Sequence, residues 1–145
     1  FQQVTAAEAS ELLTLMREFY EHSEMPWSAA TAAAAVGELL NRPERGAAWL
    51  LRSDGKSVGY CVLTLAFSLE FGGAFGLLDE LYVREEFRDR GLGSATLRFV
   101  ESQCREFGAH TLRLETGIAN PDGVRFYERH GLTREPRYLM TKRLR

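Results

Sequence analysis

The sequence predicts a single α+β domain, residues 1–145, in which a mixed, mostly antiparallel sheet is flanked by helices. Segments with apolar residues at three- and four-residue spacing, typical of amphipathic helices, alternate with β-branched and aromatic runs typical of strands. A tight turn joins two of these runs, as in a β-hairpin. No repeat, low-complexity segment or linker interrupts the chain, and its length suits one domain with a substantial core.

In the first half of the chain, local signals mark where helices begin and where strands turn. Thr5 and Glu8 have the spacing of a capping box, and Ser28 can cap the helix that follows it. The turn Ser53-Asp54-Gly55 predicts a hairpin. The expected elements are the end of a strand over 1–4, whose start we expect before Phe1, a helix over 5–21, an alanine-rich helix over 28–40, and strands over 47–52 and 56–67.

The second half is predicted to begin with the central strand and its helix. An apolar stripe of Ala95, Leu97, Val100 and Cys104 marks the helix, which Gly108 ends. A second helix is capped by Asn120 and has a proline in its first turn. The expected elements are strand 77–83, helix 94–107, strand 110–116, a helix from 121 that closes at 131, and a last strand over 138–144.

The loop Arg88-Asp89-Arg90-Gly91-Leu92-Gly93 connects the central strand to its helix. Two glycines before a helix allow a tight turn whose N–H groups point outward, and such a nest suits a diphosphate. Arg84, Arg88 and Arg90 can add charge-assisted hydrogen bonds. The alternative is a plain strand–turn–helix connection. A dinucleotide-binding module is disfavoured, because Thr96 stands where the third glycine of G-x-G-x-x-G is required.

Composition excludes several classes of protein. Eighteen basic and 20 acidic residues give a net charge of −2, which offers no basic stripe for a nucleic acid. The apolar run 58–67 is too short to span a bilayer, and no histidine has metal-ligand spacing. Cys61 and Cys104 are expected to be small core residues in a reducing compartment. We therefore expect a cytoplasmic protein without a metal, a nucleic-acid partner or a membrane partner.

Two motifs resemble those of the GNAT superfamily of N-acyltransferases. Arg88, Gly91 and Gly93 form the pattern R-x-x-G-x-G after a strand, as in the acyl-CoA pyrophosphate loop of that family. Asn120 before a short helix, and Tyr127 before Gly131-Leu132, are similar to its second motif. The expected order of elements is also similar to the GNAT fold over nearly the whole chain.

The resemblance implies acetyl-CoA as the cofactor. The central strand and the strand 110–116 would splay apart, and the pantetheine arm would lie between them. The pyrophosphate would bind to the amides of the glycine loop, and Asn120 would bond the pantetheine. The implied cofactor-binding residues are Leu81, Tyr82, Val83, Arg88, Asp89, Arg90, Gly91, Leu92, Gly93, Ser94, Asn120 and Tyr127.

The implied reaction is direct attack of a neutral amine on the acetyl carbonyl in a ternary complex. The Leu81 N–H would stabilise the oxyanion, and Tyr127 would protonate the departing thiolate. Asp79 and Glu80 are adjacent on a strand, so their side chains should leave opposite faces. Glu80 is slightly favoured as the acceptor-site carboxylate over Asp79, and a water chain is the other candidate for the base.

The expected acceptor is the primary amine of a small molecule, or of a protein. The candidate substrate-binding residues are Tyr20, Trp27, Glu70 and Phe71. The acidic residues near them suit a cation. The oligomeric state stays open, although many relatives form homodimers. The alternative function is a catalytically weak acyl-CoA-binding or regulatory domain.

Overall fold

A computed structural model describes residues 1–144 of the chain. The residues fall into two compact units, Phe1–Glu115 and the segment from Thr116 onward. In chain order, the helices and strands of the first unit are β1 (Gln2–Gln3), α1 (Ala9–His22), α2 (Ala29–Asn41), β2 (Gly46–Ser53), β3 (Lys56–Ser68), β4 (Gly73–Val83), α3 (Leu92–Glu106) and β5 (Leu112–Leu114). The second unit contains α4 (Pro121–Arg129).

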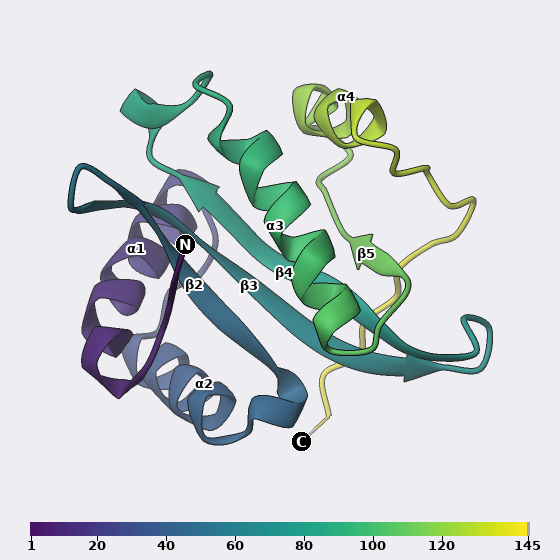
Figure 1. Cartoon of the computed structure of the whole chain (residues 1–145), viewed down its shortest axis with the longest axis horizontal. Coiled ribbons are helices and arrows are strands. Elements are labelled where there is room, and N and C mark those ends of the chain that lie inside the picture. The colour runs from purple at the N-terminus through teal and green to yellow at the C-terminus, as the bar shows by residue number, and fades with distance from the viewer. Residues whose placement is uncertain (145) are drawn as a thin grey trace. The chain divides into compact units, whose positions relative to one another are not determined.

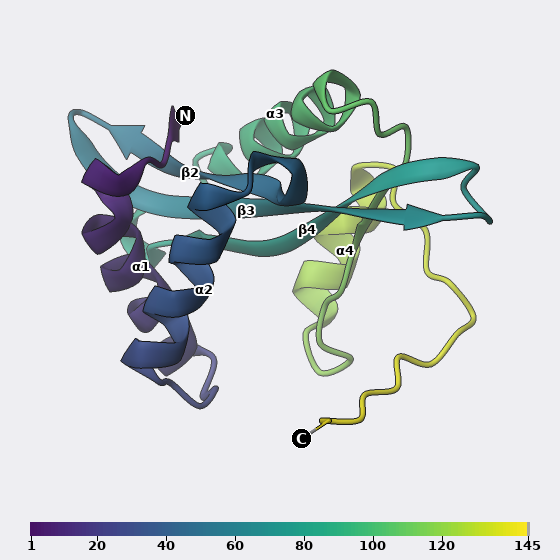
Figure 2. The same cartoon turned by 90° about the horizontal axis from the view of Figure 1, so that it is seen from below.

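The first unit is a five-stranded sheet in the order β1-β2-β3-β4-β5. The first four strands pair antiparallel, and β5 pairs parallel with β4. Helices α1 and α2 cover one face of the sheet, and α3 covers the other (Figures 1 and 2). The predicted α+β class with a mostly antiparallel sheet is therefore confirmed.

The local signals predicted most helix starts correctly. Thr5 and Glu8 form the capping box, followed by a short 3-10 turn that leads into α1. The Ser28 hydroxyl accepts a hydrogen bond from the Thr31 N–H and caps α2. Helix α3 begins at Leu92, two residues earlier than predicted, because Gly91 adopts a left-handed conformation with φ 79°.

Each face of the sheet has its own buried side chains. On one face, α1 and α2 contribute Leu12, Leu15, Met16, Ala32 and Val36 to a core that also contains Tyr60, Val62 and Tyr82. On the other face, α3 buries Leu97, Val100 and Cys104. Gly76 of β4 is buried here, and a Cβ at that position would overlap Cys104 Sγ. This glycine therefore permits the close approach of α3 to the sheet.

The parallel pairing of β5 is shorter than the predicted strand over 110–116. Only Leu112–Leu114 pair with β4, opposite Gly76–Leu78. Directly after Leu78, β4 contains a bulge, which disrupts a ladder and increases its twist. Beyond this point β4 continues to Val83 without β5. The expected splaying of these two strands is therefore present.

The predicted last strand over 138–144 is wrong, because no described residue after β5 belongs to a strand. The run Tyr-Leu-Met-Thr-Lys-Arg-Leu lacks the regular alternation that would give it one buried face. Its large apolar side chains are exposed, with Tyr138 at 95% and Met140 at 88%. Without burial or a partner strand, the β propensity of these residues does not produce a strand.

Candidate active site

A pocket of about 420 Å³ lies between α1, α2 and the sheet, within the first unit. Most of its wall is apolar, and an acidic pair from β4 forms a polar patch in it. Its lining consists of Leu12, Met16, Tyr20, Ala35, Val36, Glu38, Leu39, Arg45, Val62, Thr64, Leu65, Asp79 and Glu80. The size and the few convergent polar groups are typical of a small-molecule site.

The bulge in β4 brings Asp79 and Glu80 to the same pocket. Leu78 pairs with Leu63 and Glu80 pairs with Val62, so Asp79 is the extra residue without a partner on β3. Both residues line the pocket. The expectation that the two carboxylates leave opposite faces is therefore wrong, because it assumed a regular strand, and a bulge re-aims the side chains beside it.

Two tyrosine hydroxyls bind the carboxylate of Glu80. Tyr20, on α1, donates to Oε1 at 2.7 Å, and Tyr60, on β3, donates to Oε2 at 2.7 Å. Tyr60 has no exposed surface, whereas Tyr20 is half-buried. Asp79 is exposed and has no hydrogen-bond or ion-pair partner within residues 1–144. The two neighbouring carboxylates therefore have different surroundings.

Desolvation shifts the pKa of each acidic group in this cluster. Although Asp79 is exposed, nearby protein atoms partly desolvate its carboxyl and raise its pKa. Desolvation also raises the pKa of Glu80, against the opposing effect of the hydrogen bonds from Tyr60 and Tyr20. The pKa values of Tyr20 and Tyr60 are raised by desolvation and by the charge of Glu80. The tyrosines therefore remain protonated donors at neutral pH, and raised carboxyl pKa values are typical of functional sites.

The strand that carries this acidic pair also has an open edge. The Arg84 N–H donates to the Val58 carbonyl at 2.8 Å, across β3 and β4. Because an antiparallel ladder alternates, the N–H and C=O groups of Leu81 and Val83 point to the opposite edge. Pairing with β5 ends at Leu78, so β5 does not reach these groups. The Val83 carbonyl accepts a hydrogen bond from Arg88 Nε at 2.8 Å.

The glycine loop contains two residues with positive φ. Asp89 and Gly91 both adopt left-handed conformations, with φ 58° and 79°. The N-cap residue of α3, Gly91, has no side chain that could cap the helix, and its carbonyl accepts a hydrogen bond from the Ala95 N–H. The positive end of the helix dipole thus faces the loop.

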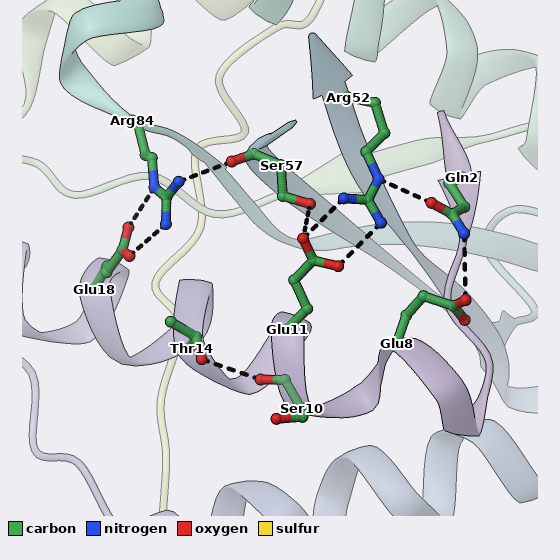
Figure 3. Close-up of polar contacts among 9 residues, drawn as sticks. All are labelled: Gln2, Glu8, Ser10, Glu11, Thr14, Glu18, Arg52, Ser57 and Arg84. Atoms are coloured by element: carbon green, nitrogen blue, oxygen red, sulfur yellow. Dashed lines mark hydrogen bonds and ion pairs between the residues drawn. The ribbon is translucent and has the colours of Figure 1, made fainter. Parts of the chain in front are cut away.

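The arginines near this loop are largely engaged elsewhere. Arg84 binds both carboxylate oxygens of Glu18 at 2.6 and 2.8 Å and also donates to the Ser57 carbonyl at 2.8 Å (Figure 3). Its bonds hold α1 against the sheet, so the expectation that it assists an anion at the loop is not supported. Arg88 is anchored on Val83, while the Arg90 guanidinium lies 5.4 Å from the Phe87 ring centre.

A second polar cluster joins α1 to the sheet at Glu11, about two turns before Glu18 (Figure 3). Arg52 of β2 binds both oxygens of Glu11 at 2.8 and 2.9 Å. The Ser57 hydroxyl also donates to Glu11, at 2.6 Å. Glu11 and Glu18 thus hold one side of α1 against the sheet, while its apolar side contributes to the pocket.

In the second unit, Asn120 and Tyr127 occupy the expected places on α4. The Asn120 side chain accepts a hydrogen bond from the Gly123 N–H at 3.1 Å and caps the helix. Tyr127 lies in the last turns of the helix, with its ring edge-to-face to Phe126. The Tyr127 carbonyl accepts the N–H groups of His130 and Leu132, which end the helix.

Of the residues predicted to bind the substrate, only Tyr20 lines the pocket. Trp27 packs edge-to-face against Tyr20, with ring centres 5.4 Å apart. Glu70 and Phe71 lie in the turn between β3 and β4, outside the pocket lining. Sequence reasoning missed Tyr60, because a tyrosine in a buried strand carries no local signal of a polar partner.

Two further properties of residues 1–144 bear on the kind of protein. No helix in this range has the length and apolar character needed to cross a membrane. In the same range, no group of three or more His, Cys, Asp or Glu side chains is arranged to hold a metal ion.

Comparison with known proteins finds similarity to acetyltransferases. A model of the Acetyltransferase (GNAT) family matches residues 10–132. An aminoalkylphosphonate N-acetyltransferase from Salmonella typhimurium is 33% identical over 91 residues, which are 63% of this chain and 58% of that protein. The chain thus spans little more than half the length of this curated relative.

Solved structures have the same fold. An integron cassette protein from the mobile metagenome of Cole Harbour Salt Marsh is 35% identical, with a TM-score of 0.87 over 99% of this chain and 90% of that one. An aminoglycoside N-acetyltransferase in complex with CoA has a TM-score of 0.85 at 14% identity, over 98% of this chain and 92% of that one. The second match shows likeness of fold alone.

Proposed function

Because the chain belongs to the GNAT family of acetyltransferases, we propose that it transfers an acetyl group from acetyl-CoA to the primary amine of a small molecule. The observation that carries this proposal is the acidic pair Asp79 and Glu80 in an otherwise largely apolar pocket. The next residue on β4, Leu81, directs its backbone groups to the open edge of the strand. An amine in the pocket and an acyl group along this edge would meet at one strand.

The open edge and the glycine loop are our proposed cofactor site. The pantetheine arm would bond the backbone between Leu81 and Val83, in the place where β5 no longer pairs. The pyrophosphate would bind the loop amides from Arg88 to Ser94, at the start of α3. We assign Asn120 to the pantetheine as well, because Asn120 before the short helix α4 matches the second motif of the family.

Three groups of this chain supply the chemistry. A carboxylate of the acidic pair takes the proton of the bound ammonium, which leaves a neutral amine able to attack the acetyl carbonyl. The Leu81 N–H is directed to the open edge and stabilises the developing oxyanion. The Tyr127 hydroxyl donates a proton to the sulfur of the departing thiolate.

The electrostatics of the pocket favour a cationic acceptor. Arg45 is the one cationic side chain in the pocket lining, and it pairs with Glu38 at 3.1 Å. Asp79 and Glu80 therefore have no basic counterpart among the lining residues. The Salmonella relative is named for an aminoalkylphosphonate, which carries an amine beside an anionic phosphonate, so its amine group is the part that suits the acidic pair. A small primary amine fits both observations.

The two cysteines support a reducing compartment such as the cytoplasm. Cys61 and Cys104 are both free and buried. Burial raises the pKa of each thiol, to about 12 for Cys61. Such thiols behave as small core residues, in keeping with a reducing environment.

The test combines binding and turnover. A ligand present at one hundred times its Kd stabilises the native state by about 2.7 kcal/mol, so acetyl-CoA and CoA should raise the melting temperature, while NAD and ATP should not. Amine-dependent release of CoA across a panel of primary amines then identifies the acceptor. Tight CoA binding without consumption of any amine would instead indicate an acyl-CoA-binding or regulatory domain.

A further inference from the structure

The two carboxylates of the acidic pair differ in their hydrogen-bond partners. Both oxygens of Glu80 accept hydrogen bonds at 2.7 Å, one from Tyr20 and one from Tyr60. Asp79, the unpaired residue of the bulge, has no such partner within residues 1–144 and is exposed to solvent. The same pocket therefore contains one fixed carboxylate and one unrestrained carboxylate.

The hydrogen bonds of Glu80 oppose its protonation. Each phenol donates to a different oxygen, so the bonds stabilise the charged form and fix the plane of the carboxylate. A proton arriving on either oxygen would compete with a phenol that is already in place. Tyr60 is completely buried, so water cannot readily replace its hydroxyl. Glu80 is therefore suited to attract and orient a cation.

Asp79 is suited to the opposite task. Its oxygens are unoccupied by any partner from the described chain, so either can accept a proton without loss of a protein hydrogen bond. Its exposure gives the proton a route to bulk water after each turnover. Its position beside Glu80 on β4 brings it to the same pocket.

We propose that the pair divides the work: Glu80, held by Tyr20 and Tyr60, orients the substrate ammonium, and Asp79 takes its proton. This inference rests on the proposed acetyl transfer. One N–H bond of the ammonium breaks, its electron pair stays on nitrogen, and the proton joins an oxygen of Asp79 before passing to water. Tyr20 and Tyr60 are positioning residues that act through Glu80.

The other charged groups of the pocket do not change this assignment. Glu38 of α2 and Arg45, which precedes β2, neutralise each other in an ion pair. The remaining contributions of α1, α2 and β3 to the lining are uncharged, and Tyr20 stays protonated because its pKa is raised. The titration of the pocket is therefore governed by Asp79 and Glu80.

The experiment compares Asp79→Asn with Glu80→Gln, and adds Tyr60→Phe and Tyr20→Phe. We expect Asp79→Asn to lower kcat on the order of 100-fold, to abolish the acid limb of the kcat–pH profile, and to leave KM for the amine nearly unchanged. Glu80→Gln and both tyrosine variants should raise KM for the amine about tenfold and keep the acid limb. If Tyr60 had only a structural role, Tyr60→Phe would not raise KM for the amine selectively while the acid limb of the kcat–pH profile is kept.

A second measurement does not depend on turnover. Amine binding to the complex with CoA, where no acetyl group is available, should weaken in Glu80→Gln and Tyr60→Phe but hardly at all in Asp79→Asn. Affinity for acetyl-CoA, measured by calorimetry, should match the wild type in every variant and reports that the fold is intact.

The outcomes separate this inference from the proposed function. An acid limb that is lost in Glu80→Gln and kept in Asp79→Asn would reverse the roles, and a limb kept in both would assign the proton to water; either result overturns the inference. Amine binding that is unaffected by Glu80→Gln would also overturn it. A wild-type protein that binds the amine with the expected dependence on Glu80, but never acetylates it, would refute the proposed function alone.

Discussion

Glu18, on α1, binds the guanidinium of Arg84 through both carboxylate oxygens, at 2.6 and 2.8 Å, across 66 positions of sequence (Figure 3). The same guanidinium donates to the Ser57 carbonyl. The pair therefore connects the helix that lines the pocket to the strands beneath it.

We predict that Arg84→Ala lowers the free energy of unfolding by about 1 kcal/mol, since the pair is bidentate but partly exposed. Acetyl-CoA affinity should not change, because Arg84 is committed to Glu18. Urea unfolding and calorimetry measure the two effects. Arg17→Ala is the control, because the Arg17–Glu21 pair on the same helix is exposed and should contribute almost nothing. A marked loss of cofactor affinity in Arg84→Ala would contradict this assignment.

The contact between α3 and the sheet predicts that alanine substitutions at two glycines change the stability of the protein in opposite directions. Gly76→Ala should destabilise the protein by about 1–3 kcal/mol, because the new methyl group would overlap Cys104 Sγ and approach Leu63 Cδ1 to 3.0 Å. Gly37→Ala, in α2, meets no atom within 4 Å and should stabilise it by about 0.5–1 kcal/mol. Both predictions are tested by the midpoints of denaturant-unfolding curves, provided that the slope of the free energy of unfolding with denaturant stays constant. Equal effects of the two substitutions would show that α3 does not pack as closely as described.

Acid–base linkage gives a pH-dependent prediction for Asp79. The fold raises the pKa of Asp79 above 3.8, so the charged form is disfavoured in the native state. The carboxyl therefore contributes most favourably below its unfolded pKa, and this contribution is lost as pH rises through the folded pKa. Asp79→Asn should be more stable than the wild type at neutral pH, and the difference should vanish in acid.

Glu8 provides the comparison of opposite sign. Hydrogen bonds from the Thr5 hydroxyl and N–H lower the pKa of Glu8. The capping interaction is therefore present above the unfolded pKa and is lost as pH falls through the folded pKa. Glu8→Gln should destabilise the protein at neutral pH and converge with the wild type in acid. Thermal melts across pH distinguish these profiles, and parallel profiles for Asp79→Asn and Glu8→Gln would refute the assignment.

Tyr127→Phe tests the proposed proton donor to the thiolate. We expect kcat to fall on the order of 100-fold, while affinity for acetyl-CoA stays near the wild-type value. Tyr138→Phe is the matched control, because the Tyr138 side chain is 95% exposed and has no proposed role. If binding and turnover fell together in Tyr127→Phe, the hydroxyl would be a binding group instead.

The elements that were predicted correctly are marked by residues that lie only a few positions apart in the sequence, such as a helix cap or a turn. The cap at Ser28 and the hairpin turn at Asp54-Gly55 are examples, since both depend on local backbone chemistry. The expected strand over 138–144 failed for the complementary reason. Whether such a run forms a strand depends on a partner and a buried face, which the run itself does not specify.

The acidic pocket was only partly predictable. Glu80 and Asp79 could be selected as carboxylates on the central strand, but their shared orientation depends on the shift in register between β3 and β4 at Val62 and Leu63. The hydrogen bonds of Glu80 join it to Tyr20 and Tyr60, which are 60 and 20 positions away. The contact with Tyr20 arises from packing of α1 on the sheet, and the contact with Tyr60 arises from the pairing of β3 with β4, so no local spacing encodes either.

The bulge at Asp79 has a consequence for how the site can change through insertions and deletions. Leu77 and Glu80 keep regular partners on either side of it, Thr64 and Val62, so Asp79 occupies the ladder as a single supernumerary residue. Its loss would leave Leu77, Leu78 and Glu80 in an ordinary alternation, with every flanking side chain on its present face. A one-codon indel could thus add or remove the second carboxylate while the remainder of the sheet stays in register.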